Sequence, residues 1–332
     1  MKNLAINANY KLLEKGVLVF VHNKGTLYAR RQGTTLIKST NYGKSWEVLG
    51  IFSEDIRGIF VNDNEEIFVS ASWNIRNPHG KGKIYKSCDN GITFKKVLEV
   101  NSGAALNWNI DTKNNTMFIS EYGIKTGDNA RRIYRSLDRG ETWETVYNPN
   151  PQLNYHCHKL LIAENAVYQS VGDNVNACIL SSRDNGDSWQ TIIKGFHPTS
   201  GIETNSHVLW GLDTGPFAGI AGLNKSTGEM DFEFALPHPF HGPAYDMAKA
   251  NDVVYAVFNS YDGNIHPGSI WCSKDDGATW QLFAKIEKQA CEGVGMWNFT
   301  ADDKYGYIAL QMPVHGNETK EEYVGTLRFE LL

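Results

Sequence analysis

The sequence contains little cysteine and no excess of basic residues. Its five cysteines are scattered through 332 residues, and no two of them form a Cys-x-x-Cys pair. Neither a disulfide framework nor a thiolate zinc site is therefore indicated. Lys and Arg number 32 against 37 Asp and Glu, which gives a formal net charge of −5. Such a balance cannot neutralise a phosphate backbone, so nucleic acid is excluded as the expected partner.

Long apolar runs are also missing. No segment reaches the ~18 consecutive apolar residues that a membrane-spanning helix needs. The first ten residues, Met1–Tyr10, lack the apolar core and the small-residue cleavage site of a signal peptide. We therefore expect a soluble, reduced, cytoplasmic protein that does not contact a membrane, and a secreted one only if a leader precedes this sequence.

A short motif returns five times along the chain. It has Ser first, Asp or Asn third, Gly fifth, Ser or Thr seventh, and Trp or Phe last. The copies are Ser39–Trp46, Ser87–Phe94, Ser136–Trp143, Ser182–Trp189 and Ser273–Trp280. Successive copies start 48, 49, 46 and 91 residues apart. Because the last interval is about twice the others, we place a degenerate copy near its middle, at Leu223–Met230.

The chemistry of the motif is that of a hairpin turn. An Asp or Asn side chain at the third position can accept hydrogen bonds from backbone N–H groups a few residues later. Glycine at the fifth position adopts a positive φ without steric cost. The closing aromatic ring begins the return strand and can cover the apolar side of the hairpin.

The motif resembles the Asp-box, the bacterial neuraminidase repeat of sialidase-like β-propellers. In that family the boxes occupy the turns between the third and fourth strands of a blade, away from the substrate. The resemblance thus implies a structural role for the box residues and gives no information about catalysis.

Short strand-like runs surround each motif. In one repeat, Leu160–Ile162, Ala166–Ser170 and Ala177–Leu180 precede the box, and Gln190–Ile193 follows it. Four short strands per unit of ~40–50 residues are typical of a propeller blade. Six such units and a closing seventh from Gly293 to Leu332 fill the chain. We therefore predict an all-β fold, a seven-bladed β-propeller of four-stranded antiparallel blades, as a single domain over residues 1–332.

The position of the boxes indicates where a functional site should lie. In propellers the turns before the first strand and after the second strand of each blade share the face opposite the boxes. Function should gather there, where first strands begin and second strands end. The residues that we place at this mouth are polar, aromatic and rich in histidine.

His156 and His158 form the sharpest local feature. Residues i and i+2 of a strand point to one face with Cα atoms ~6.5–7 Å apart, which suits two ligands of one metal ion. We therefore consider one divalent metal ion at this pair. The alternative is that both imidazoles only form hydrogen bonds with neighbouring blades.

Acidic residues end the second strands of three successive blades. They are Glu121, Asp173 and Asp213. Two carboxylates beside a channel mouth can act as the acid and base of a glycosidase. The alternative is that they cap turns.

The sialidase activity of the resembling family is not expected. That family binds the substrate carboxylate with three arginines from separate blades, and this sequence has no arginine between Arg183 and Arg328. Lysine cannot replace the planar, bidentate guanidinium.

A carbohydrate-active propeller is the leading functional prediction. It would be a polysaccharide lyase or a glycoside hydrolase acting on an oligosaccharide or polysaccharide, with a histidine as base and a tyrosine as acid. The candidate catalytic residues are His156, His158, Glu121, Tyr122, Asp173, Tyr245 and Arg57. The candidate substrate-binding residues are Trp73, Trp108, Asp213, His241, Tyr261 and Trp297. The alternative is a non-catalytic scaffold that binds a glycan or a protein partner.

Overall fold

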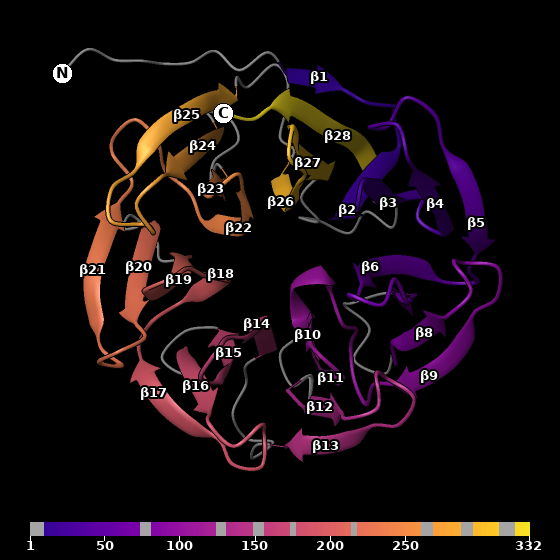
Figure 1. The fold of residues 1–332 in the computed structure, drawn as a ribbon, viewed down its shortest axis with the longest axis horizontal. Helices are drawn as coiled ribbons and strands as arrows, with labels where there is room; N and C mark the ends of the chain where they lie inside the picture. Colours follow the sequence, from indigo (N-terminus) through magenta and orange to yellow (C-terminus); the bar gives the residue numbers. More distant parts are fainter. Residues whose placement is uncertain are drawn as a thin grey trace. The chain divides into compact units, whose positions relative to one another are not determined.

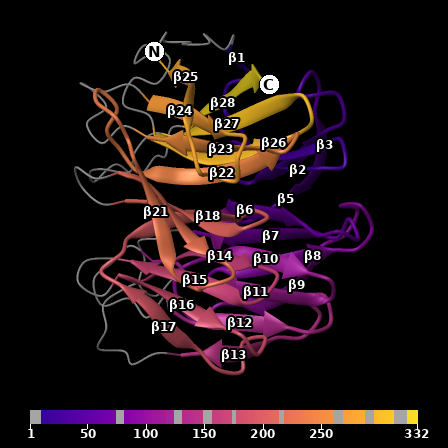
Figure 2. The ribbon, with the colours of Figure 1, turned by 60° about the vertical axis from the view of Figure 1, so that its left-hand side comes forward.

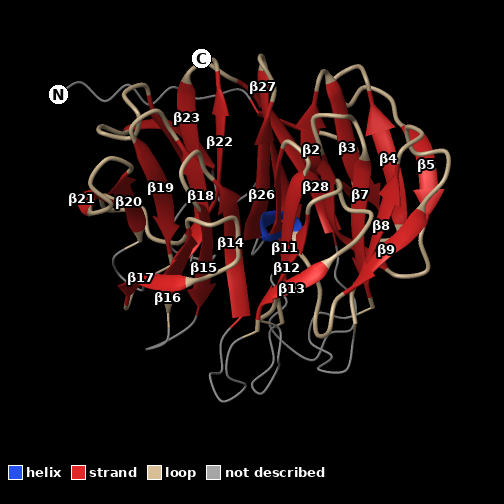
Figure 3. Cartoon of the chain, turned by 60° about the horizontal axis from the view of Figure 1, so that its bottom comes forward, coloured by secondary structure: helices blue, strands red, loops and turns tan. Residues whose placement is uncertain are grey.

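Strands make up nearly all of the regular structure. The computed structural model describes residues 10–73, 81–123, 131–148, 156–172, 177–213, 218–259, 268–286, 295–311 and 323–332. Within these ranges there is a single short 3-10 helix, η1 (Asn107–Asn109), drawn in blue among the strands in Figure 3. Over the same ranges, no helix has the length and apolarity that a membrane crossing requires.

Seven four-stranded antiparallel sheets form the fold, which is the predicted seven-bladed β-propeller (Figure 1). Six sheets contain four consecutive strands each, and the seventh combines the last three strands with the first. In chain order the strands are β1 (Tyr10–Leu12); β2 (Val17–Asn23), β3 (Thr26–Arg31), β4 (Thr35–Ser39) and β5 (Glu47–Ile51); β6 (Asp55–Val61), β7 (Ile67–Ser72), β8 (Lys83–Ser87) and β9 (Lys95–Glu99); β10 (Ile110–Lys113), β11 (Thr116–Ser120), β12 (Ile133–Ser136) and β13 (Glu144–Tyr147); β14 (His156–Ile162), β15 (Val167–Gly172), β16 (Cys178–Ser182) and β17 (Gln190–Lys194); β18 (Pro198–Glu203), β19 (His207–Leu212), β20 (Gly219–Asn224) and β21 (Met230–Ala235); β22 (Ala244–Ala250), β23 (Val253–Phe258), β24 (Gly268–Ser273) and β25 (Gln281–Ile286); and β26 (Gly295–Ala301), β27 (Tyr305–Gln311) and β28 (Tyr323–Glu330).

Contacts divide the chain into two compact units. The first unit contains Met1–Gln32, Ser39–Trp46 and Thr199–Leu332, and the second contains Gly33–Lys38 and Glu47–Pro198. The second unit holds three complete sheets, β6–β9, β10–β13 and β14–β17, which follow one another in Figure 2. It also holds His156, His158 and most of the other candidate residues.

The seventh sheet joins the two ends of the chain. Strand β1 pairs antiparallel with β28, so that Tyr10 faces Phe329 and Leu12 faces Leu327. Strands β27 and β28 lie within the final segment, Gly293 to Leu332, that the sequence analysis assigns to the seventh blade. The sequence does not predict the fourth strand of this sheet, which comes from the N-terminal segment.

Strand register separates the box end of each sheet from the other end. In the sheet β14–β17, His156 pairs with Gly172 at one end, and Ile162 pairs with Val167 at the other. Val167 also pairs with Ser182, the first residue of a box. First strands therefore begin, and second strands end, opposite the boxes, as the sequence analysis predicts.

The box geometry is clear at Ser136–Trp143. The carboxylate Oδ1 of Asp138 accepts a hydrogen bond from the backbone N–H of Thr142 at 2.9 Å, and the Ser136 hydroxyl oxygen accepts one from Gly140 N–H at 2.7 Å. Gly140 has φ +82°, where an L side chain is strained. A Cβ on Gly140 would lie 2.7 Å from the ring of Phe68 in the preceding sheet. The box thus packs directly against its neighbour, which supports a structural role.

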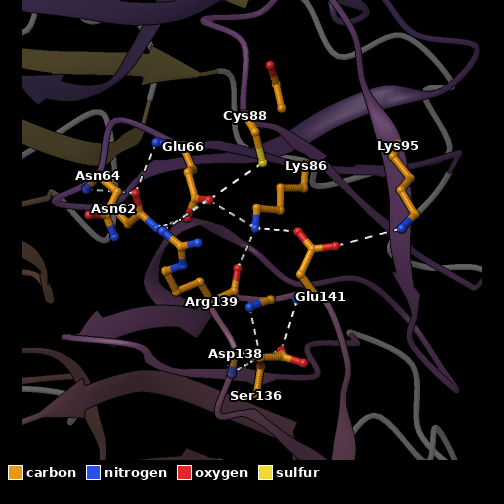
Figure 4. A network of polar contacts seen from close by, with 12 residues as sticks. Asn62, Asn64, Glu66, Lys86, Cys88, Lys95, Ser136, Asp138, Arg139 and Glu141 are labelled. Atoms are coloured by element: carbon orange, nitrogen blue, oxygen red, sulfur yellow. Dashed lines mark hydrogen bonds and ion pairs between the residues drawn. The ribbon is translucent and has the colours of Figure 1, made fainter.

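A buried lysine ties the box Ser136–Trp143 to the sheet before it (Figure 4). Lys86, which directly precedes the second box, donates to the carbonyl oxygen of Arg139 at 2.8 Å and to the Glu141 carboxylate at 2.6 Å. Its ammonium also lies 3.1 Å from Glu66 Oε1. A buried ammonium is stable only when it is paired in this way, so Lys86 fixes two consecutive sheets to each other.

The same connection recurs between later sheets. Arg135 directly precedes the third box and donates to the carbonyl oxygen of Asn185 and to Asp187 at 2.7 Å, both in the fourth box. In the first unit, Arg328 donates to the carbonyl oxygen of Tyr42 in the first box at 2.8 Å. In all three cases a strand cation binds the carbonyl of the fourth residue of the next box.

The carboxylates of the boxes should make the folded protein less stable in acid. Hydrogen bonds from the Thr142 hydroxyl and N–H lower the pKa of Asp138 from 3.8 to about 2. A depressed pKa in the folded state stabilises the fold above pH ~4, and this contribution disappears as the pH falls from ~4 to ~2. We expect Asp138→Asn to flatten the dependence of the urea midpoint on pH in this window. Asp252→Asn, at a carboxylate that is 99% exposed, should leave it unchanged, and equal slopes for all three proteins would contradict the prediction.

Candidate functional site

Four rings from two neighbouring sheets of the second unit form an aromatic–histidine cluster: Trp108, Tyr122, His156 and His158. Trp108 meets Tyr122 edge to face, with ring centroids 5.7 Å apart. Tyr122 lies 4.5 Å from His156 and 6.1 Å from His158, and the two imidazole centroids are 4.7 Å apart. The cluster lies at the end of the sheets opposite the boxes, where the sequence analysis predicts the site.

The backbone brings Trp108 and Tyr122 to this end. Trp108 belongs to η1, directly before β10, and Tyr122 follows β11. Tyr122 exchanges two backbone hydrogen bonds with Ala104, of 2.7 and 2.9 Å. A Cβ on Gly103 would lie 2.1 Å from the carbonyl oxygen of Tyr122. The absence of a side chain at Gly103 therefore permits the close approach that positions Tyr122.

His156 and His158 lie on one side of β14, as their spacing predicts. Their Nε2 atoms are 2.7 Å apart, and Nδ1 of His158 lies 3.0 Å from the carbonyl oxygen of Pro198. His158 is 6% exposed, whereas His156 is half-buried. Gly172 pairs with His156 across the sheet. A Cβ on Gly172 would lie 2.3 Å from the His158 ring, so the absence of a side chain at this glycine leaves the space that the His158 imidazole fills.

The separation of the two Nε2 atoms matches a shared proton better than a shared metal ion. Two nitrogens bound to one tetrahedral zinc at ~2.0–2.1 Å would be roughly 3.3 Å apart. Across the described ranges, no three His, Cys, Asp or Glu side chains gather in a way that could hold a metal ion. We therefore do not assign His156 and His158 as metal ligands.

Glu121 lies inside the protein, and not at the surface of the mouth as predicted. Its side chain is 0% exposed. Five donors surround its carboxylate at 2.6–3.2 Å: the backbone N–H groups of Asn101, Ser102, Arg131 and Arg132 and the hydroxyl of Tyr134. Burial raises the pKa of Glu121, and the hydrogen bond from Tyr134 opposes that rise. This placement gives Glu121 a structural role, holding together the segments that flank its own sheet.

Arg57 is also buried and paired. Its guanidinium donates to Asp55 at 3.1 Å and to the carbonyl oxygens of Ser72 and Trp73 at 3.3 Å. Its side chain is 6% exposed. Arg57 was predicted to be a catalytic residue, but in the structure its guanidinium holds the end of β7 and the backbone of Trp73.

Trp73 presents its side chain to solvent. It directly follows β7 and is 70% exposed. The sheet of Trp73 packs closely against the segment that carries Trp108. At Gly58 in β6 the approach is so close that a Cβ would lie 3.0 Å from the backbone nitrogen of Asn107, the residue before Trp108. The indole is exposed at the end opposite the boxes, and Arg57 binds the backbone carbonyl of Trp73. Its role in substrate binding stays a prediction.

The remaining candidate residues are not brought to this cluster by any described contact. Asp173 and Tyr261 lie outside the described residues. Trp297 belongs to β26, and its side chain is also outside them. Asp213, Tyr245 and His241 are half-buried in the first unit. Asp213 directly follows β19, Tyr245 belongs to β22, and His241 lies three residues before the start of β22.

Three supporting parts of the site were not predicted from the sequence. Asn109 is fully buried and donates to the carbonyl oxygens of Cys157 and His158, at 3.2 and 2.7 Å. The Pro198 carbonyl and the bare backbone of Gly172 complete the surroundings of His158. Glycine at the end of a strand was the available signal, because it often marks a close approach. No sequence pattern identifies a backbone carbonyl.

Comparisons with known proteins agree on the fold. No protein-family model matches the chain. A curated xyloglucanase of Paenibacillus sp. is 24% identical over 255 residues, which are 63% of this chain and 24% of that protein. A solved GH74 enzyme of Niastella koreensis matches with a TM-score of 0.65 and 15% identity over 90% of this chain and 52% of its own. YCF48 bound to D1 peptide matches with a TM-score of 0.65 and 13% identity over 99% of both chains. The chain therefore shares its fold with the two solved structures, and it spans about a quarter of the length of the xyloglucanase.

Proposed function

We propose that this protein binds an oligosaccharide at the aromatic–histidine cluster and cleaves a glycosidic bond there. The observation that carries the proposal is the contact of Trp108, Tyr122 and the His156–His158 pair at the end of the sheets opposite the boxes. The resemblance to a xyloglucanase and to a GH74 enzyme supports a carbohydrate ligand. We extend the proposal to membership of the Asp-box, sialidase-like propellers, which the observed box geometry supports.

Sugar recognition would rely on the exposed indole of Trp73. Sites for small molecules combine aromatic surfaces with a few placed polar groups. An indole that is 70% exposed offers a flat apolar face to a sugar ring. Arg57 holds the backbone beneath it, so little backbone entropy would be lost when a ligand stacks on this side chain.

Proton transfer would rely on the histidine pair. Histidine is the commonest acid–base group in enzymes, because its ordinary pKa lies near neutral pH. Glu121 is sequestered by its five donors, which leaves His156 as the half-buried acid–base group of the cluster. Tyr122, 4.5 Å away between ring centroids, supplies a hydroxyl that could protonate a leaving group.

Incubation with a panel of xyloglucan-type and uronate-containing oligosaccharides tests the proposal. New reducing ends without unsaturated products would indicate hydrolysis. An absorbance rise from unsaturated uronates would indicate elimination. Neither binding nor product across the panel would overturn the proposed function.

Removing the exposed indole should weaken oligosaccharide binding. We expect Trp73→Ala to raise the Kd about tenfold or more, since a stacked aromatic contact contributes on the order of 1–2 kcal/mol. Titration calorimetry with a ligand found in the panel would measure the change. Ile92→Ala is the matched control, because Ile92 is 82% exposed at the box end of the same sheet. An unchanged Kd for Trp73→Ala, or an equal loss in the control, would contradict the prediction.

A scaffold that binds a protein partner is the second candidate. It is favoured by the resemblance to YCF48 bound to D1 peptide, which covers 99% of both chains. Under this function, Trp73 and the cluster would contact a peptide, and no oligosaccharide would be turned over. A peptide-display selection against the wild-type protein, repeated with Trp73→Ala, separates the two functions.

A further inference from the structure

We propose that His158 is a positioning residue that fixes the protonation of its neighbour, so that Nδ1 of His156 is the atom that accepts a proton at this site. The catalytic meaning of this assignment rests on the proposed function. The assignment itself rests on the described contacts of the two imidazoles.

The first step is the hydrogen bond between His158 and Pro198. The Pro198 carbonyl oxygen can only accept, so Nδ1 of His158, 3.0 Å away, must carry the hydrogen. A neutral imidazole protonated at Nδ1 has an unprotonated Nε2. In its neutral form His158 therefore presents an acceptor to His156.

The second step is the contact between the two Nε2 atoms. At 2.7 Å they hold one proton between them, because two N–H groups cannot point at each other over this distance. When both rings are neutral, that proton belongs to His156, since Nε2 of His158 must accept. His156 then carries hydrogen at Nε2, and its Nδ1 is the basic nitrogen.

The third step is the proton balance of the pair. A proton that leaves the substrate adds to Nδ1 of His156, and the pair changes from neutral to a single positive charge. The proton between the Nε2 atoms can then move to His158, whose Nδ1–H remains on the Pro198 oxygen. The charge can thus reside on either ring, because the N–H bond broken at Nε2 of His156 is replaced by one formed at Nε2 of His158. The pair returns to its neutral form by the reverse route, when Nδ1 of His156 releases its proton to water.

Packing prevents the imidazoles from turning to another arrangement. The His158 ring fills the space above Gly172, where a Cβ would be 2.3 Å away. The Tyr122 ring covers His156 with a centroid separation of 4.5 Å. Asn109 fixes the backbone of β14 by donating to the carbonyl oxygens of Cys157 and His158. The pair is therefore held on both rings and on its strand.

Nitrogen-15 NMR of the full chain with labelled histidine tests the inference without any substrate. Spectra are recorded at mildly alkaline pH, where a histidine of ordinary pKa is neutral, and His156→Gln identifies the resonances of His156. We expect His156 protonated at Nε2, His158 protonated at Nδ1, and a coupling between the two Nε2 nuclei through the hydrogen bond. His156 protonated at Nδ1 in the wild-type protein would overturn the inference.

Two variants separate positioning from mere packing. His158→Asn retains an N–H donor that can replace Nδ1 towards Pro198, but its shorter side chain has no acceptor at the position of Nε2. His156 should therefore lose its single tautomer while the protein stays folded. His207→Asn, at a histidine of the first unit that pairs with Asp231, should leave the His156 spectrum unchanged. If His158→Asn leaves the His156 tautomer unchanged, His158 does not position it.

The outcome is independent of the proposed function. The expected tautomers without oligosaccharide turnover would support the inference and count against the enzyme. Oligosaccharide turnover by a protein whose His156 is protonated at Nδ1 would support the enzyme and contradict the inference. Should His158→Asn not fold, the wild-type spectra alone decide the question.

Discussion

Glu121→Gln should destabilise the protein by on the order of 3–5 kcal/mol, the range seen when one member of a buried, hydrogen-bonded ionic network is removed. Glu121 is fully buried, and all of its five partners are donors. A glutamine amide has only one oxygen. Its NH₂ group would face either the N–H groups of Arg131 and Arg132 or the donors on the other side, and those donors would stay buried without an acceptor.

Urea unfolding of the wild-type protein and the variant measures this effect. Glu99→Gln is the matched control: Glu99 lies in the same unit, is 37% exposed and pairs with Lys96 at the surface. It should change stability by less than about 1 kcal/mol. A stable Glu121→Gln protein that has lost oligosaccharide turnover would contradict the structural role and restore Glu121 as a catalytic carboxylate.

His156 and Glu121 differ in how well their side-chain positions could be predicted from the sequence. The repeat of boxes determines where each sheet begins and ends, and so it placed both residues at the end opposite the boxes. The i, i+2 spacing then placed His156 and His158 on one side of β14, and their rings do meet, although the pairing of β14 with β15 shifts register between Cys157 and Leu160. Glu121 lies one residue beyond the end of β11, where strand alternation no longer determines which way a side chain points.

Two other features depended on contacts between distant parts of the chain. Tyr10–Leu12 is an exposed three-residue strand without a distinctive pattern, and only its pairing with β28 reveals it. Arg57 was predicted to be catalytic, but Asp55 and the carbonyl oxygens of Ser72 and Trp73 bind its guanidinium. Local patterns predict strands and turns well, whereas the partners of a charged side chain depend on how the neighbouring segments fold around it.

Gly103→Ala should cost about 2–5 kcal/mol and also disturb the aromatic–histidine cluster. Gly103 has φ +63°, which costs an L residue roughly 1–2 kcal/mol. Its new Cβ would lie 2.1 Å from the Tyr122 carbonyl oxygen, an atom that Ala104 N–H already binds at 2.9 Å. Because a backbone oxygen has to move, the overpacking adds about 1–3 kcal/mol. Tyr122 would be displaced with its carbonyl, away from Trp108 and His156.

The control for Gly103→Ala isolates the backbone strain. Gly195 has φ +73° in the same unit, and a Cβ there would meet no atom within 4 Å. Gly195→Ala should therefore lose only the conformational part, roughly 1–2 kcal/mol, and keep wild-type ligand binding. Urea unfolding gives the two stabilities, and near-ultraviolet circular dichroism reports the packing of the aromatic side chains, to which Trp108 and Tyr122 contribute. Equal losses in the two variants, with unchanged aromatic signals, would show that the approach of Gly103 to Tyr122 does not position the cluster. A larger loss at Gly103 with an altered aromatic signal is the expected result, because the same glycine allows both the fold of this segment and the placement of the Tyr122 ring.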